Sequence, residues 1–204
     1  PRPMAATELE LAVTEGVRYT LDQIKVTGGE AAIETDKARY FFGFGGGLLI
    51  GSSDRLYSPQ KLKASVGRLE NEFRRRGYAD AMVEAEVTQI DHETGKVAVS
   101  VAVIAGPRWQ ITSIVLPADI PDEVKLPELK VAEKDTWDGN WQQDKSQAVR
   151  QSFFAAGYPD VRVAVTPVLR ELSGGVQSVE VKINVVPGER VMIGRIKFQG
   201  DERT

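Results

Sequence analysis

The stretch Ala105-Gly-Pro-Arg-Trp-Gln-Ile-Thr-Ser-Ile-Val-Leu116 carries the strongest structural signal in this chain, because its pattern occurs three times. This copy is centred on Gly106, and the other two are centred on Gly16 and Gly188. Counted from each glycine, an arginine follows at position +2, and apolar residues follow at +3, +5, +8 and +10. A pattern that returns at a regular spacing indicates a repeated structural unit.

Each copy predicts a strand that ends near the glycine, a sharp corner, and a new strand. The apolar alternation slips between positions +5 and +8, so the new strand cannot keep one apolar face without an extra residue. A β-bulge at that point would restore the apolar face. We therefore expect bulges between Leu21 and Ile24 and between Ile111 and Ile114.

A second repeated signal lies between the glycine corners. The pair Gly77-Tyr78 returns 80 residues later as Gly157-Tyr158. Tyr57 and Trp137 are also 80 residues apart and precede these pairs by the same distance. Two separate anchors with one spacing indicate that the unit is duplicated.

The segment before Gly77 has the signals of an amphipathic helix. Ser58 is a suitable N-cap, and Pro59 suits the first helical position. Apolar residues then follow at helical spacing, namely Leu62, Val66, Leu69 and Phe73. Gly77 suits the left-handed conformation that ends many helices. In the second unit, Asp138 and Gly157 predict a helix of the same kind.

Two strands are predicted after each Gly-Tyr pair. Residues 81–87 alternate with period two, residues 91–95 predict a hairpin turn, and residues 96–105 form the return strand. The second unit repeats this order through residue 185. The sequence therefore predicts an α+β fold of two tandem β-α-α-β-β modules, each a three-stranded mixed sheet with two helices on one face.

The repeat also sets the expected domain limits. Module one is expected at 17–106, with an insert near 41–51, and module two at 107–188. Residues 1–16 are expected to be the terminal strand of a preceding module or a linker, and 189–204 the first strand of a following, truncated module. In module two, three prolines predict that the first helix is short or irregular, at Pro117, Pro121 and Pro127.

The composition excludes several classes of function. The chain is 42% hydrophobic and 27% charged, as in ordinary folded proteins, and its net charge of -3 does not favour nucleic acid as a partner. It has no cysteine and one histidine, which excludes thiol catalysis and multi-histidine metal sites. No apolar run approaches the roughly 20 residues that a membrane span needs.

Two short motifs resemble active-site sequences, but neither predicts catalysis. The run Gly43-Phe-Gly-Gly-Gly47 lacks the Lys-Ser/Thr ending of a phosphate-binding loop. Asp91-His-Glu93 falls in a predicted hairpin turn, where such residues are expected for local reasons. We therefore predict no catalytic residue, no cofactor site and no metal site.

The ordered series of motifs resembles tandem POTRA (polypeptide-transport-associated) domains. The matching features are the Gly-x-Arg-aromatic-x-Ile strand, the Tyr57 or Trp137 ahead of the second helix, and the Gly-Tyr pair that closes that helix. The resemblance covers nearly the whole chain. Each motif is weak alone, whereas the series seen twice is fairly specific.

The resemblance implies a non-enzymatic role in protein transport. POTRA arrays form the periplasmic arm of outer-membrane β-barrel proteins of the Gram-negative type, such as BamA- and TamA-like assembly factors and two-partner secretion transporters. The implied partners are unfolded outer-membrane protein precursors, periplasmic accessory proteins and the protein's own C-terminal barrel. The alternative is a rigid structural spacer that binds no client.

The resemblance also implies that the strand after Gly-Tyr is an exposed edge. An open edge can bind an extended chain through backbone hydrogen bonds. We therefore expect a docking edge in module one, formed by Met82, Val83, Glu84, Ala85, Glu86 and Val87. In module two, Pro159 and Pro167 blunt the matching edge. The alternative is that both edges are covered or unused.

Two further groups are candidate functional residues. Phe42, Phe44, Leu48 and Leu49 either form a hydrophobic contact loop or supply phenylalanines to the core. The expected inter-module hinges combine the repeated glycines and arginines, namely Gly16, Arg18, Gly106, Arg108, Gly188 and Arg190. Their arginines are either exposed strand charges or partners in salt bridges that fix the hinge angle.

Overall fold

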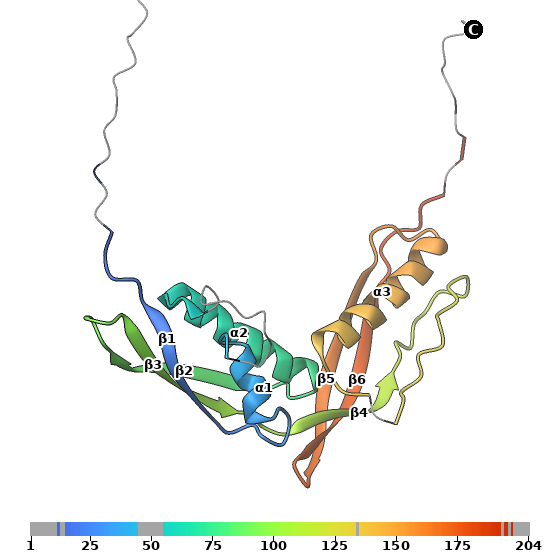
Figure 1. The fold of residues 1–204 in the computed structure, drawn as a ribbon. Coiled ribbons are helices and arrows are strands. Elements are labelled where there is room, and N and C mark those ends of the chain that lie inside the picture. The colour runs from blue at the N-terminus through green and yellow to red at the C-terminus, as the bar shows by residue number, and fades with distance from the viewer. Residues whose placement is uncertain are drawn as a thin grey trace, which may run out of the picture.

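The structure is a computed structural model that describes residues 12, 15–44, 55–133, 135–192, 194, 195 and 197. Figure 1 shows two small modules joined end to end. The first contains β1 (Thr20–Thr27), α1 (Thr35–Tyr40), α2 (Pro59–Arg75), β2 (Met82–Ile90) and β3 (Lys96–Ile104). The second contains β4 (Arg108–Val115), α3 (Gly139–Ala155), β5 (Arg162–Ser173) and β6 (Val176–Val186).

The two sheets have the same topology. The strand order is β1-β3-β2 in the first and β4-β6-β5 in the second. In each sheet the central strand pairs in parallel with the first strand and antiparallel with the hairpin partner, so both sheets are mixed. The α+β prediction of two tandem three-stranded mixed sheets is confirmed.

The expected bulges are present. The β1 register shifts between Leu21 and Gln23, and the β4 register shifts between Ile111 and Ser113. Each shift falls where the apolar alternation slips, which confirms that an extra residue returns the later side chains to the core face.

The two long helices, α2 and α3, begin and end where the sequence predicts. The Ser58 hydroxyl accepts a hydrogen bond from the backbone N–H of Lys61 at 3.1 Å. The Asp138 carboxylate accepts from the N–H groups of Asn140 and Trp141. Gly77 has φ +90° and Gly157 has φ +94°, which are left-handed values that a glycine adopts without strain.

Each module has its own hydrophobic core. Leu69 and Phe73 of α2 pack with Ala38 of α1 and with the inward residues of β3. Val149 and Phe153 of α3 pack with Val179 and with other inward residues of β5 and β6. The two clusters share no residue, so each helix covers its own sheet.

Module two differs from module one between its first strand and its helix. The prediction of two helices in each module is wrong for module two, because residues 116–133 form no helix and the segment, yellow in Figure 1, is a long loop. Val124 of this loop is buried, and Leu126, Leu129 and Val131 pack against the same core. The prolines that remove helical hydrogen bonds thus leave a loop that still closes one side of the core.

The two sheets fall inside the predicted modules, whose limits at residues 17, 106 and 188 stay predictions. Most of residues 1–16 and part of 189–204 lie outside the described part of the chain. Within the described part, no helix is long and apolar enough to cross a bilayer.

Candidate functional site

The most open strand edge of module one is β2. It forms one margin of its sheet, and β1 forms the other. The β1 margin is partly covered, because Thr20 is bridged by Leu56 and the Tyr57 N–H donates to the Tyr19 carbonyl at 2.9 Å. In module two, Thr136 and Trp137 cover β4 in the same way. The hairpin strands β2 and β5 form the opposite margins of the two sheets, and no such bridge covers them among the described residues.

Alternation decides which backbone groups of β2 face away from the sheet. In an antiparallel pair, each second residue directs its N–H and C=O away from the partner strand. The Val83 N–H donates to the Glu70 carboxylate of α2 at 3.3 Å, so Val83 is one of these residues. Ala85 and Val87 lie two and four residues further along, so their N–H and C=O groups also face outward. The register shift after Val87 ends this series of outward-facing residues.

The start of this run is already occupied by α2. Glu70 accepts from Val83, and Arg74 pairs with Glu70 at 2.7 Å while donating to the Ala81 carbonyl at 3.5 Å. We found no such contact to the outward groups of Ala85 and Val87 among the described residues. The open part of the predicted docking edge is therefore its second half.

The side chains of the predicted edge divide between two faces. Val83 is buried, and Ala85 and Val87 are half-buried on the face that α2 covers. Met82, Glu84 and Glu86 are exposed on the opposite face.

The matching margin of module two is closed by two features. The Gln142 amide of α3 donates to the Val165 carbonyl at 2.8 Å, so Val165 faces outward. Pro167 has the same phase and no N–H to offer. The structure places Pro167 within β5 and Pro159 before its start, so Pro167 is the proline that removes an outward donor.

The predicted hinge between the modules is a main-chain joint. Gly106 has φ +69°, and three residues later the Trp109 N–H donates to the Gly77 carbonyl at 2.7 Å. The Trp109 indole N–H also donates to the Asp80 carboxylate at 3.1 Å. A Cβ atom on Gly77 would lie 2.6 Å from the Cβ of Thr136 in module two. The corner thus brings the end of α2 against the next module.

The same joint recurs at the end of module two. Gly188 has φ +77°, and the Val191 N–H donates to the Gly157 carbonyl at 2.8 Å. The Arg190 guanidinium donates to the Ala156 carbonyl at 3.1 Å and pairs with Glu123 at 3.2 Å. In the described chain, Arg18 and Arg108 form no ion pair within 4.0 Å, and Gly16 has no positive φ.

Glu123 joins the loop of module two to both Tyr158 and Arg190. Its carboxylate accepts from the Tyr158 hydroxyl at 2.8 Å. A hydrogen bond from its own backbone N–H, followed by the Tyr158 bond, lowers the pKa of Glu123, and Arg190 lowers it less. The bond to Glu123, followed by burial, raises the pKa of Tyr158. The charged form of Glu123 is therefore favoured at this joint.

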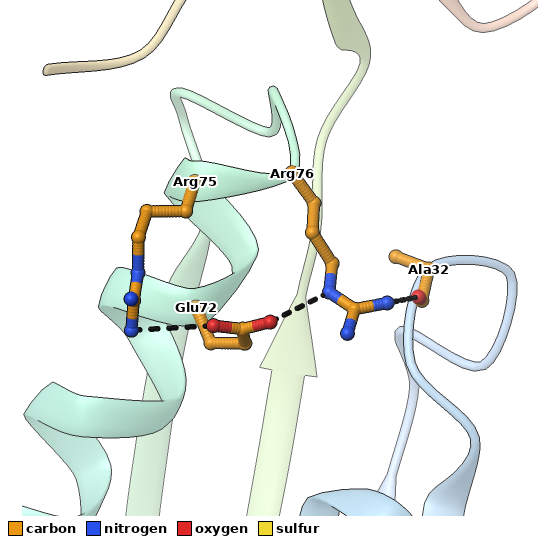
Figure 2. Close-up of polar contacts among 4 residues, drawn as sticks. All are labelled: Ala32, Glu72, Arg75 and Arg76. Atoms are coloured by element: carbon orange, nitrogen blue, oxygen red, sulfur yellow. Dashed lines mark hydrogen bonds and ion pairs between the residues drawn. The ribbon is translucent and has the colours of Figure 1, made fainter. Parts of the chain in front are cut away.

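The run Arg74-Arg-Arg76 is paired within the module. Figure 2 shows Glu72 between Arg75 and Arg76, at 3.2 Å and 2.9 Å. Arg76 also donates to the Ala32 carbonyl at 2.9 Å, which ties the end of α2 to the turn before α1. Because Arg74 pairs with Glu70, all three arginines form ion pairs within module one.

The predicted hydrophobic loop is divided by the structure. Phe42 is 2% exposed and lies in the core of module one, which removes it from any contact surface. Phe44 is half-buried, and the guanidinium groups of Arg39 and Arg55 lie 5.7 Å and 5.2 Å from its ring centroid. Leu48 and Leu49 lie outside the described residues.

A cavity of about 800 Å³ lies beside Phe42, between α1 and α2. The Arg68 guanidinium at its border donates to the Phe41 carbonyl and to the Ser65 hydroxyl. Arg76 at the same border is held by Glu72 and Ala32. These hydrogen bonds tie α2 to the end of α1 and to the turn before α1.

Asp91 and Glu93 form hydrogen bonds within the hairpin turn, and His92 contacts Tyr19 of the first strand region. The Asp91 carboxylate accepts from the Thr94 hydroxyl and from the N–H groups of Thr94 and Glu93, and the Thr94 hydroxyl bond is the largest cause that lowers the pKa of Asp91. His92 Nδ1 lies 2.7 Å from the Tyr19 hydroxyl. Across the residues that the structure describes, no group of three His, Asp or Glu residues could hold a metal ion.

The fold and its joints define a tandem repeat of small mixed-sheet modules. Residues 19–106 match the model of the POTRA family, described as a surface antigen variable number repeat. Module one therefore matches a POTRA domain, and module two repeats its strand order and its main-chain joint.

Several solved structures are similar to the chain. POTRA3-5 of Haemophilus influenzae BamA is 14% identical with a TM-score of 0.48, over 83% of this chain and 62% of that one. POTRA1-2 of the periplasmic domain of Anabaena Omp85 is 16% identical with a TM-score of 0.42, and the match covers 83% of this chain and 96% of that one. CdiB from Escherichia coli is 18% identical with a TM-score of 0.31, over 89% and 30%. The chain thus spans 62% of the Haemophilus fragment.

Proposed function

We propose that the chain is a periplasmic arm of an outer-membrane β-barrel assembly or secretion protein, and that β2 binds an extended segment of a client or accessory protein. The POTRA match over residues 19–106 supports the setting. The observation that carries the binding role is the run of outward backbone groups at Ala85 and Val87, on a margin beside which the described residues form no further strand.

Strand addition suits such a role physically. The incoming segment gains backbone hydrogen bonds that any sequence can form, and side chains on its two faces add selectivity. The half-buried Ala85 and Val87 offer an apolar surface to alternate residues of the segment. One edge can therefore bind many extended chains, which is what a transport arm requires.

The structure supplies a matched test of this proposal. Val87 and Pro167 occupy equivalent positions in the two sheets, because Val87 pairs with Val99 and Pro167 pairs with Val181. Val87→Pro therefore introduces a residue that module two already accommodates at this position. The change removes one outward N–H. Val87→Ala keeps the N–H and serves as the control.

The probe is a neutral alternating peptide, Thr-Thr-Val-Thr-Val-Thr with blocked ends, titrated into the ¹⁵N-labelled chain. We expect amide shifts along 83–87, retained in Val87→Ala and lost in Val87→Pro. Shifts elsewhere, or equal binding by the two variants, would leave the spacer role as the better description. A concentration-dependent dimer in sedimentation that Val87→Pro abolishes would mean that a second copy occupies this edge.

A further inference from the structure

The exposed face of β2 carries a charge pattern that the fold does not require. Glu84 and Glu86 are exposed on the same face, two residues apart. Their neighbours on β3 are Ala102 and Ser100, which are uncharged. Within the described residues, no basic group lies within 4.0 Å of either carboxylate.

The sister module shows that these carboxylates are not needed for the sheet. Ala164 and Thr166 occupy the matching positions, because Ala164 pairs with Asn184 as Glu84 pairs with Ala102. The β2 edge therefore carries two carboxylates, and the β5 edge, where Gln142 binds the Val165 carbonyl, carries none at the two matching positions. The charges occur where a strand can be added.

The carboxylates also lie where a docked strand would meet them. A strand added beside β2 would lie about 4.8 Å away, with side chains directly opposite those of Glu84 and Glu86. Lys25 of β1 is in the same row, but it lies two strands away, at about 10 Å by the same spacing. Charged side chains of a docked strand would therefore interact with Glu84 and Glu86 more strongly than Lys25 does.

We propose that the segment bound by β2 is an extended strand with basic residues at alternate positions, which face Glu84 and Glu86, and small or β-branched residues on its other face. This inference rests on the proposed function and names the chemistry of its partner. Opposite charges across a strand pair are stabilising, and like charges are destabilising. Ala85 is the first residue of this edge whose outward backbone groups are available to a docked strand, because the Val83 N–H already donates to Glu70.

The test compares three blocked peptides that differ only at two positions: Thr-Lys-Val-Lys-Val-Thr, Thr-Glu-Val-Glu-Val-Thr and the neutral Thr-Thr-Val-Thr-Val-Thr. We expect the lysine peptide to bind the full chain about five- to tenfold more tightly than the glutamate peptide, with shifts on 83–87. The preference should weaken as salt rises. In Glu84→Lys/Glu86→Lys the order of the charged peptides should reverse.

A matched control separates charge from edge. Ala164→Glu/Thr166→Glu/Lys182→Ser places the same carboxylates on β5, and it also replaces the basic cross-strand partner of residue 166 by serine, which is the partner of Glu86 in module one. On β5, Gln142 and Pro167 block the outward groups of Val165 and of residue 167. We expect no lysine-peptide shifts on β5 in this variant. Binding there equal to that on β2 would overturn the inference, because simple charge attraction would then suffice.

The two proposals fail in different ways. If the three peptides bound β2 with equal affinity and Val87→Pro abolished that binding, the preference for a basic partner would be rejected while the docking edge would be retained. No shift on β2 by any peptide would remove both. A lysine preference that survives Glu84→Gln/Glu86→Gln would also overturn the inference, since these carboxylates would not be its source.

Discussion

The backbone N–H of Trp109 donates to the carbonyl of Gly77, and this contact is the centre of the joint between the two modules. Gly77 directly follows the C-cap of α2, the last helix of module one, and Trp109 is the second residue of β4, the first strand of module two. One hydrogen bond thus connects the helix end of one unit to the first strand of the next. Its copy between Val191 and Gly157 indicates that the joint belongs to the repeat.

Replacing Gly77 should destabilise this joint in two ways. Gly77→Ala places a side chain in a left-handed conformation and against Thr136, for an expected loss of about 2–4 kcal/mol. Gly174→Ala is the control, because Gly174 also has a left-handed φ of +58°, but a Cβ added there would meet no neighbouring atom within 4 Å. This variant should lose only the conformational contribution, about 1 kcal/mol of stability. Urea unfolding measures both, and equal losses would show that the Thr136 contact contributes nothing.

The two cores should respond separately to mutation. Phe153 is fully buried, whereas its neighbour Phe154 is 51% exposed. Phe153→Ala should cost about 3–5 kcal/mol and Phe154→Ala less than about 0.5 kcal/mol. In Phe153→Ala, NMR signals of module two should broaden or collapse while those of module one persist. Simultaneous loss of both sets would contradict two independent cores.

The closed edge of module two should open when its two blocks are removed. Gln142→Ala frees the Val165 carbonyl, and Pro167→Val restores an outward N–H. We expect the double variant to acquire amide shifts on β5 with the neutral alternating peptide, and each single variant to show less. An unresponsive β5 in a folded double variant would show that an open margin alone does not create a docking edge.

The Glu123 contact predicts a pH effect at the second joint. Tyr158→Phe removes one of the hydrogen bonds that lower the pKa of Glu123, so this pKa should rise while the backbone bond keeps it below the usual value. A carboxyl with a lowered pKa adds stability above its unfolded pKa and loses it as pH falls through the folded pKa. The stability gap between wild type and variant should therefore shrink in acid.

This effect is measured by ¹³C titration of the Glu123 carboxyl and by urea unfolding at neutral and acidic pH. Tyr78→Phe, at the matching position of module one, should leave the Glu123 pKa unchanged. A Glu123 pKa that does not move in Tyr158→Phe would show that the hydroxyl contributes little.

The elements that the sequence predicted well are those with local signals. The two bulges follow from a slip in apolar period, and the helix ends follow from Ser58, Asp138, Gly77 and Gly157. The relevant groups lie within a few residues of each other, so spacing is sufficient. The duplication supplied the rest of the topology, since each unit confirms the pattern of the other.

The backbone side of the candidate site could not be predicted in this way. Period-two alternation shows which side chains face the core, but the outward N–H groups depend on the hydrogen-bond phase with the partner strand. The contacts of Glu70 with Val83 and of Gln142 with Val165 cross from helix to strand. They depend on how each helix lies on its sheet, which no local spacing encodes.

The loop of module two shows a related limit. Pro117, Pro121 and Pro127 predicted a short or irregular helix, but not a complete loop whose apolar residues pack on the core. Proline removes helical hydrogen bonds, and it does not determine where Val124 or Leu126 then packs. Long-range packing decides that outcome.

A joint whose central bond joins two main-chain groups does not depend on the identity of the side chains that flank it. Trp109 and Val191 differ greatly in size, yet each donates the same amide to the same carbonyl. Side chains around the corner can therefore differ between the two joints while the main-chain link between successive units stays the same. Units with different surfaces can be exchanged within such a string, provided that the two glycines remain.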